Sequence, residues 1–294
     1  MIYQTPLFLA LLVRATVLIL LSALHSSGAA SSTISWNSYA IAAPAVKKPF
    51  FGSKNDDDLP TFTDLALVSG TDKVTDNNYS VLHDKYLPAF RDKPVRMIEI
   101  GLGCEMDHPC EMRSVITSVS IHSYGPGASY KTWMKYFPHV DLNTVEYDEI
   151  CGKAWTAKNP EATVFYGEQA SAPFIKKVGS EVTAPGLVDI IVDDGGHTMT
   201  QQENSLRELW PFLRPGGIYF AEDLHTSFMD SYGGDASRAD PAKRTFMTFI
   251  HELVDDFMAA KVGVPSKNAW YKDIASIDCM EALCVLTKKE KGAR

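Results

Sequence analysis

The chain has 294 residues, 45% of them hydrophobic, so it is long enough to bury a sizeable core in one large domain or two small ones. Its formal net charge is -8 at pH 7. Nucleic-acid binding needs a basic surface that neutralises phosphates, and the sequence shows no basic stripe. We therefore expect a small-molecule partner and no nucleic-acid partner.

The five cysteines show no CxxC pair; they are Cys104, Cys110, Cys151, Cys279 and Cys284. This spacing indicates neither a zinc site nor a dense disulfide framework. Because their number is odd, we expect at least one thiol to be free or paired between chains.

Residues 1–30 differ in composition from the rest of the chain. Residues 6–24 are apolar and carry Arg14 as their single charge, and small residues follow them. The pattern predicts a secretory signal peptide, or an uncleaved membrane anchor through residues 2–24. In an anchor, Arg14 would cost about 2.5–3.5 kcal/mol at mid-span; a buried soluble helix is the third alternative. We expect a location in the secretory pathway or at a membrane.

Residues 31–59 predict a linker rich in small and polar side chains, and we expect the folded domain over residues 60–290. A turn is predicted at Ser69–Lys73 and a helix at Tyr79–Phe90. His83 lies on the apolar face of this helix, where a packed histidine is more common than a ligand.

Short apolar runs alternate with amphipathic segments from residue 95 onwards. Strands are predicted at Val95–Cys104 with its turn, Leu142–Tyr147, Ala162–Tyr166, Leu187–Asp193, Ile218–Asp223, Ile274–Cys279 and Ala282–Thr287, and helices at Ala128–Phe137, Ile150–Ala157, Ala172–Val178, Met199–Leu213 and Thr245–Ala260. The alternation predicts an α/β fold with a doubly wound, mostly parallel seven-stranded sheet. The last two strands are close enough in sequence to form an antiparallel hairpin.

Acidic residues follow two of the predicted strands. Asp193 and Asp194 end the first apolar run, and two glycines separate them from His197. Glu222 and Asp223 end the second. If the strands are neighbours in a parallel sheet, Asp194, Glu222 and Asp223 converge as oxygen donors beside an imidazole, a set that suits Mg²⁺. The alternative is that these acids only solvate strand ends.

A glycine-rich turn follows the first strand, in the sequence Glu99-Ile-Gly-Leu-Gly103. Glycines after a strand let a nucleotide approach the backbone. A dinucleotide fingerprint needs a third glycine, and that position is Met106. An NAD-dependent dehydrogenase is therefore disfavoured.

The acid two residues before the first glycine resembles the first motif of class I S-adenosylmethionine-dependent methyltransferases. In that superfamily an acid at the end of the second strand holds the ribose, and Glu146 occupies the matching place. The closing hairpin is also the superfamily's pattern.

Further motifs sharpen this resemblance. They are Gly70–Lys73, Tyr79, Met97–Cys104, Tyr124–Ser129, Trp133, Tyr136–Pro138, Asp193–His197 and Glu222–Asp223. Together they are similar to a family of fungal methyltransferases, and in turn to bacterial metal-dependent sugar O-methyltransferases of macrolide biosynthesis, of the mycinamicin type. The likeness covers roughly residues 68–290 and implies S-adenosyl-L-methionine and Mg²⁺ as cofactors.

The resemblance implies roles for the residues at the predicted strand ends. Asp194, Glu222 and Asp223 are expected to bind the metal ion, and His197 to act as the general base.

The resemblance also implies contacts with the cosubstrate. The expected residues are Glu99, Gly101, Gly103, Glu146, Glu168 and Asp193. Glu99 is expected near the methionine moiety, Glu146 at the ribose and Glu168 at the adenine amine. Asp193 is expected nearer the cosubstrate, or as a cap of its strand.

Residues 106–122 depart from the family pattern, which has almost nothing between the glycine turn and Tyr124. Residues 114–121 could form an additional strand. We interpret the segment as a surface excursion or as a gene-model error such as a retained intron.

These observations predict methyl transfer to a hydroxyl of a secondary metabolite or sugar. One alternative is N-methylation of an amine of a peptide-derived secondary metabolite. Another is a metal-dependent hydrolase that uses the same acids and histidine, and a third is a binding protein whose site is idle. The oligomeric state does not follow from the sequence.

Overall fold

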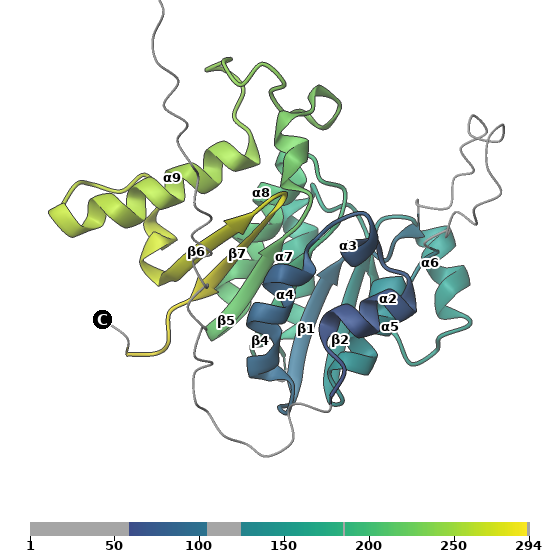
Figure 1. The fold of residues 1–294 in the computed structure, drawn as a ribbon. Helices are drawn as coiled ribbons and strands as arrows, with labels where there is room; N and C mark the ends of the chain where they lie inside the picture. The colour runs from purple at the N-terminus through teal and green to yellow at the C-terminus, as the bar shows by residue number, and fades with distance from the viewer. Residues whose placement is uncertain (1–58, 105–124, 185, 293–294) are drawn as a thin grey trace, which may run out of the picture. The chain divides into compact units, whose positions relative to one another are not determined.

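The computed structural model describes residues 59–104, 125–184 and 186–292 (Figure 1). The predicted leader, nearly all of the predicted linker and the departure at residues 106–122 lie outside the described residues. Among the helices that the structure describes, none is long and apolar enough to cross a membrane.

One seven-stranded sheet forms the centre of the fold, in the order β3-β2-β1-β4-β5-β7-β6. Its strands are β1 (Val95–Ile100), β2 (Val140–Glu146), β3 (Thr163–Tyr166), β4 (Val188–Asp193), β5 (Leu213–Ala221), β6 (Ile274–Met280) and β7 (Leu283–Lys288). β1 to β5 run parallel, and β7 is antiparallel to both β5 and β6. The predicted doubly wound sheet and its terminal hairpin are confirmed.

Helices cover both faces of the sheet (Figure 1). They are α2 (Phe62–Ser69), α3 (Asp72–Thr75), α4 (Ser80–Tyr86), α5 (Ala128–Tyr136), α6 (Glu149–Thr156), α7 (Ala172–Val182), α8 (Met199–Leu209) and α9 (Phe246–Ala259). The core on one face contains side chains of α2, α4, α5 and α6, and the core on the other contains side chains of α7, α8 and α9. Alternate strand residues point to opposite faces, so Ile190 packs in one core and Ile191 in the other.

The strand order reverses at the centre of the sheet, where β1 lies between β2 and β4. Ile100 pairs with Val145 of β2 and with Asp193 of β4, so the three strands end level with one another. Ligands of open α/β sheets bind at such a reversal, outside the carboxyl ends of the strands.

One predicted strand boundary was wrong. The strand predicted from Ile218 begins at Leu213. Leu213 pairs with Val188 while Ile218 pairs with Ile190, so the intervening residues bulge out of the ladder. Near the N-terminus, α2 was not predicted; Gly70 ends it in a left-handed conformation, and α3 follows from Asp72.

Two disulfides, Cys104–Cys151 and Cys279–Cys284, lie within the described residues. The cysteine spacing had not indicated the Cys104–Cys151 disulfide, because 47 residues separate the two cysteines and only the fold brings them together. Cys110 lies outside the described residues.

Candidate active site

A cavity of about 420 Å³ opens at the carboxyl ends of β1, β2 and β4. Two sets of predicted residues line it. One consists of Gly101, Gly103, Glu146 and Glu168, and the other of Asp194, His197 and Asp223. The structure thus brings four of the predicted cosubstrate residues and three of the predicted catalytic and metal residues to one cavity.

The glycine turn packs directly against the end of β4. Gly101 has φ 101°, its amide donates to Val145 O at 2.8 Å, and a Cβ built on it would overlap the carbonyl oxygen of Asp194. The Asp194 amide donates to Ile100 O at 3.0 Å. Only glycine allows this backbone conformation and this close approach, which places the turn beside the acidic group.

Glu146 ends β2 and is 6% exposed. Its Oε2 accepts a hydrogen bond from the Leu102 amide at 3.1 Å, and its Oε1 accepts one from the Asp148 amide at 2.7 Å. A carboxylate offers about four acceptor positions, so capacity remains for a ligand in the cavity. This position agrees with the place expected of a ribose ligand.

Asp194, His197 and Asp223 each offer one ligand atom, and these atoms lie within 4.8 Å of one another. Their side chains are 21%, 19% and 17% exposed, and His197 Nε2 lies 3.2 Å from Asp223 Oδ2. His197 Nδ1 is buried without a hydrogen-bond partner among the described residues. Two carboxylates and an imidazole with an unused nitrogen can hold a divalent cation.

His197 and Asp223 both adopt left-handed backbone conformations, with φ 59° and φ 55°. Such conformations are uncommon for residues other than glycine and cost about 1–3 kcal/mol each. His197 is held just before Thr198, which caps α8 by a reciprocal pair of contacts with Gln201. The surrounding structure therefore imposes these orientations, and both face the same cavity.

Glu222, the third predicted metal ligand, does not join this group. It is 0% exposed, its Oε2 lies 2.5 Å from Lys73 Nζ, and its Oε1 lies 3.1 Å from His83 Nε2. Burial opposes its ionisation, but Lys73 and His83 outweigh burial and lower the pKa of Glu222 to about 2. The Glu222 carboxylate thus has its partners within the protein, Lys73 and His83.

The N-terminal helical segment, which runs from α2 to α4, contributes three more residues that surround these acids. Lys73 Nζ also donates to Asp194, the hydroxyl of Tyr79 donates to Asp223, and His83 contacts Glu222. We had not predicted a functional role for any of them. The signal was present in the Gly-Thr-Asp-Lys motif and in the spacing of Tyr79 and His83, which share one helix face.

Asp193, expected at the cosubstrate or as a strand cap, is 2% exposed and does not line the cavity. It accepts hydrogen bonds from Gln169 Nε2 at 2.7 Å and from the Tyr219 hydroxyl at 2.8 Å, and burial raises its pKa to about 7. Gln169 Oε1 in turn accepts from the Gly196 amide at 2.8 Å. Asp193 therefore supports the loop that carries His197.

Glu99, expected near the methionine moiety, is fully buried and does not line the cavity. Its Oε1 accepts from Trp133 Nε1 at 2.9 Å, and burial raises its pKa to about 7. Glu168 is exposed at the cavity wall, where its Oε1 accepts from the Ala170 amide and from Gln201.

A second cleft, of about 490 Å³, lies beside the N-terminal end of β5. Three of its basic side chains have partners in the protein: Lys85 pairs with Asp278 and Arg214 with Asp189, while Lys288 donates to two carbonyl groups. It lacks the grouping of carboxylates and histidine, so the first cavity is the candidate site.

No protein-family profile matches the chain. The "MycE" methyltransferase of the mycinamycin pathway, solved with Mg, SAH and mycinamycin VI, has a similar structure, with a TM-score of 0.63 at 21% identity over 80% of this chain and 55% of that one. The fold is that of the class I methyltransferases.

Curated proteins are also similar to the chain in sequence. The L-olivosyl-oleandolide 3-O-methyltransferase of Streptomyces antibioticus is 30% identical over 218 residues, 74% of this chain and 50% of that protein. The 8-demethyl-8-alpha-L-rhamnosyl tetracenomycin-C 2'-O-methyltransferase of Streptomyces olivaceus is 28% identical over 72% of this chain and 49% of that protein. The chain thus spans about half the length of these relatives, which are bacterial.

Proposed function

We propose that the chain is an S-adenosylmethionine-dependent O-methyltransferase whose acceptor is a hydroxyl of a small molecule, with the sugar of a secondary metabolite as the expected class. One observation carries the proposal: the glycine turn with Glu146 and the group of Asp194, His197 and Asp223 line the same cavity. A methyltransferase needs a cosubstrate site and a deprotonating site within reach of one another.

The residues present fit a divalent cation. Asp194 and Asp223 supply hard oxygen donors, and His197 Nδ1 is buried without a partner among the described residues. The two carboxylates are the donors that favour Mg²⁺, while His197 stays available for proton transfer. Asp194 and Asp223 are the residues we assign to the cation, and Glu222 remains a predicted ligand whose carboxylate here contacts Lys73 and His83.

When bound, the cosubstrate supplies a methyl group on a sulfonium, and the cation lowers the pKa of the acceptor hydroxyl. Glu146 would accept hydrogen bonds from the ribose and so fix the donor in the cavity. His197 would take the acceptor proton, and Asp223, 3.2 Å from His197 Nε2, would stabilise the resulting imidazolium. Thr198 and Gln169 hold the loop that orients the imidazole.

The relatives support an oxygen acceptor over the alternatives. Both curated relatives named above are O-methyltransferases that act on glycosylated metabolites, which favours a hydroxyl over an amine. A hydrolase would use the acids and the histidine but has no need of Glu146 held against the glycine turn.

Isothermal titration of the full chain with S-adenosylmethionine, with and without Mg²⁺, tests the proposal. We expect micromolar binding, followed by transfer of labelled methyl groups to members of a panel of deoxysugar glycosides and by loss of transfer on chelation of the metal. Folded protein that binds no S-adenosylmethionine in either condition would rule the proposal out. Transfer to amines that survives chelation would point to N-methylation.

We also propose that the domain works in the secretory pathway or at a membrane. Residues 1–30 predict a leader or anchor, and the two disulfides support an oxidising compartment. Fractionation of cells that express the full chain tests this location, and a purely cytosolic distribution would contradict it.

A further inference from the structure

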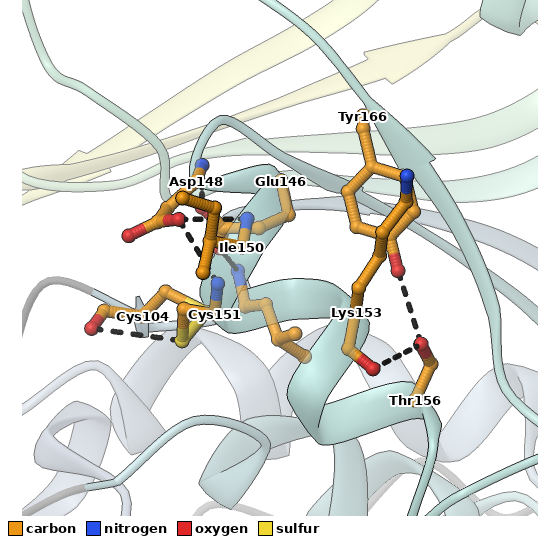
Figure 2. The surroundings of a disulfide bond; sticks show 9 residues. Cys104, Glu146, Asp148, Ile150, Cys151, Lys153, Thr156 and Tyr166 are labelled. Carbon is orange, nitrogen blue, oxygen red and sulfur yellow. Dashed lines mark hydrogen bonds between the residues drawn. A yellow bond between two sulfur atoms is a disulfide. The ribbon is translucent and has the colours of Figure 1, made fainter.

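The disulfide between Cys104 and Cys151 (Figure 2) has one of its two residues, Cys104, in the wall of the cavity. Cys104 lines the cavity and directly follows Gly103, the last glycine of the turn after β1. Cys151 belongs to the first turn of α6, the helix that follows β2 and Glu146. Both cysteines are partly exposed. The bond therefore links the two elements between which a nucleoside would bind.

Hydrogen bonds connect the same two elements through Glu146. The carboxylate accepts from the Leu102 amide in the glycine turn. It also accepts from the amide of Asp148, the N-cap residue of α6 (Figure 2). The Asp148 side chain in turn accepts from the amides of Ile150 and Cys151, each at 3.0 Å. Glu146 thus holds its position only while the glycine turn and the start of α6 keep their separation.

The start of α6 also packs closely on Glu146. A Cβ built on Gly152, next to Cys151, would lie 3.3 Å from Glu146 Cγ and would overlap the ring of Tyr166. The absence of a side chain at this position lets the helix approach the strand end. A shift of α6 would therefore move the carboxylate that faces the ligand.

These contacts form a closed circuit from Leu102 through Glu146, Asp148 and Cys151 to Cys104, and the disulfide is its covalent member. We infer that Cys104 and Cys151 are positioning residues for the cosubstrate, and that affinity for S-adenosylmethionine depends on the redox state of their disulfide. The inference rests on the proposed function. It adds a thiol–disulfide control to the cosubstrate site.

Reduction opens the circuit by thiol–disulfide exchange. A dithiol donates two electrons and two protons to the S–S bond, leaves as its own disulfide and produces two cysteine thiols. The glycine turn and α6 are then joined only by the hydrogen bonds to Glu146 and by packing. The turn gains conformational freedom that a ligand must remove on binding, so the affinity falls.

The second disulfide provides a matched control. Cys279 and Cys284 face each other across the hairpin of β6 and β7, and neither lines the cavity. Its removal changes the stability of the domain without touching the glycine turn or Glu146. If only removal of the Cys104–Cys151 disulfide lowers the affinity for the cosubstrate, the cause is the place of this disulfide beside the cavity and not the loss of a disulfide as such.

The test is calorimetric titration of the full chain with S-adenosylhomocysteine, before and after treatment with dithiothreitol, with the thiols counted by alkylation and mass spectrometry. We expect the dissociation constant to rise at least about tenfold on reduction and to recover on reoxidation. The C104S/C151S double variant should show the weak affinity with or without dithiothreitol. The C279S/C284S variant should keep the wild-type affinity and its response to reduction.

Titration with Mn²⁺ separates positioning from a general loss of structure, because Asp194 and Asp223 lie outside the circuit. We expect the affinity for Mn²⁺ to be the same in C104S/C151S and in the wild type. If the double variant does not fold, the same comparison is made between the oxidised and the reversibly reduced wild type. Equal affinity for S-adenosylhomocysteine in the oxidised and reduced wild type overturns the inference alone. Absence of binding by the oxidised wild type overturns the proposed function and the inference with it.

Discussion

Lys73 and Glu222 form an ion pair inside the domain, with side chains that are 1% and 0% exposed. Lys73 belongs to the short helix α3, and Glu222 follows β5, 149 residues later. Burial opposes the charge on Lys73, but Asp194 and Glu222 outweigh it and raise the pKa of the ammonium group. The pair attaches the N-terminal helical segment to the acids of the candidate site.

Substitution of Lys73 should strongly destabilise the domain. Lys73→Met leaves the fully buried Glu222 and the partly buried Asp194 without their cation, so we expect the free energy of unfolding to fall by about 3–5 kcal/mol. Urea denaturation at pH 7 measures the change. The control is Lys85→Met, which removes an exposed partner of Asp278 and should cost less than about 1 kcal/mol. Equal stability of Lys73→Met and the wild type would contradict the burial argument.

Gly101→Ala should damage the site more than other glycine substitutions. The new methyl group would have to occupy the position of the Asp194 carbonyl oxygen at φ 101°, so we expect a loss of about 2–5 kcal/mol. Gly70→Ala is the matched control, because Gly70 has φ 73° but nothing lies within 4 Å of its Cβ position, and we expect about 1–2 kcal/mol. Similar losses in the two variants would exclude a specific role for the close approach.

Removal of the His197 imidazole should abolish turnover and leave cosubstrate binding unchanged. For His197→Ala we expect kcat to fall by about 10²–10⁴-fold, the usual contribution of a general base. Asn tolerates the left-handed backbone at φ 59°, so His197→Asn should lose the same activity with a smaller loss of stability. Methyl transfer and calorimetric titration measure the two effects, and unchanged turnover in both variants would exclude the proposed base.

The contribution of Asp256 to stability should depend on pH. Its carboxylate, 4% exposed at the end of α9, accepts hydrogen bonds from the amides of Lys267 and Asn268 and from Asn268 Nδ2. Burial opposes its ionisation, but these donors outweigh it and lower the pKa.

A lowered folded-state pKa means that this stabilisation is complete above the unfolded-state value of about 3.9 and disappears as the pH falls through the folded-state pKa. Asp256→Asn should therefore cost about 1–3 kcal/mol at pH 7 and progressively less below about pH 4. Urea titrations of both proteins across this range check the sign. A difference that stays constant with pH would show that the charge has no part in it.

The sequence alone was sufficient for the order of the seven strands and for the meeting of Asp194 and Asp223 at one edge of the sheet. Apolar runs of strand length alternate with amphipathic segments, and parallel strands place their carboxyl ends at one edge of the sheet. The sequence therefore grouped Asp194, Glu222 and Asp223 with His197, and the structure brings Asp194, His197 and Asp223 together. The glycine turn was recognised from its glycine pattern, and the place of Glu146 was what the resemblance to class I methyltransferases implied.

The tertiary structure alone decided which partners these residues have. Whether Glu222 faces the cavity or contacts Lys73 and His83 depends on how α3 and α4 pack on the sheet, and hydrophobic periodicity does not encode that packing. The spacing of the cysteines does not reveal the disulfide between Cys104 and Cys151 either, because it joins the turn after β1 to α6, which come together only once β1 and β2 pair in the sheet. Strand ends follow from local pattern, whereas contacts between distant segments follow only from the folded chain.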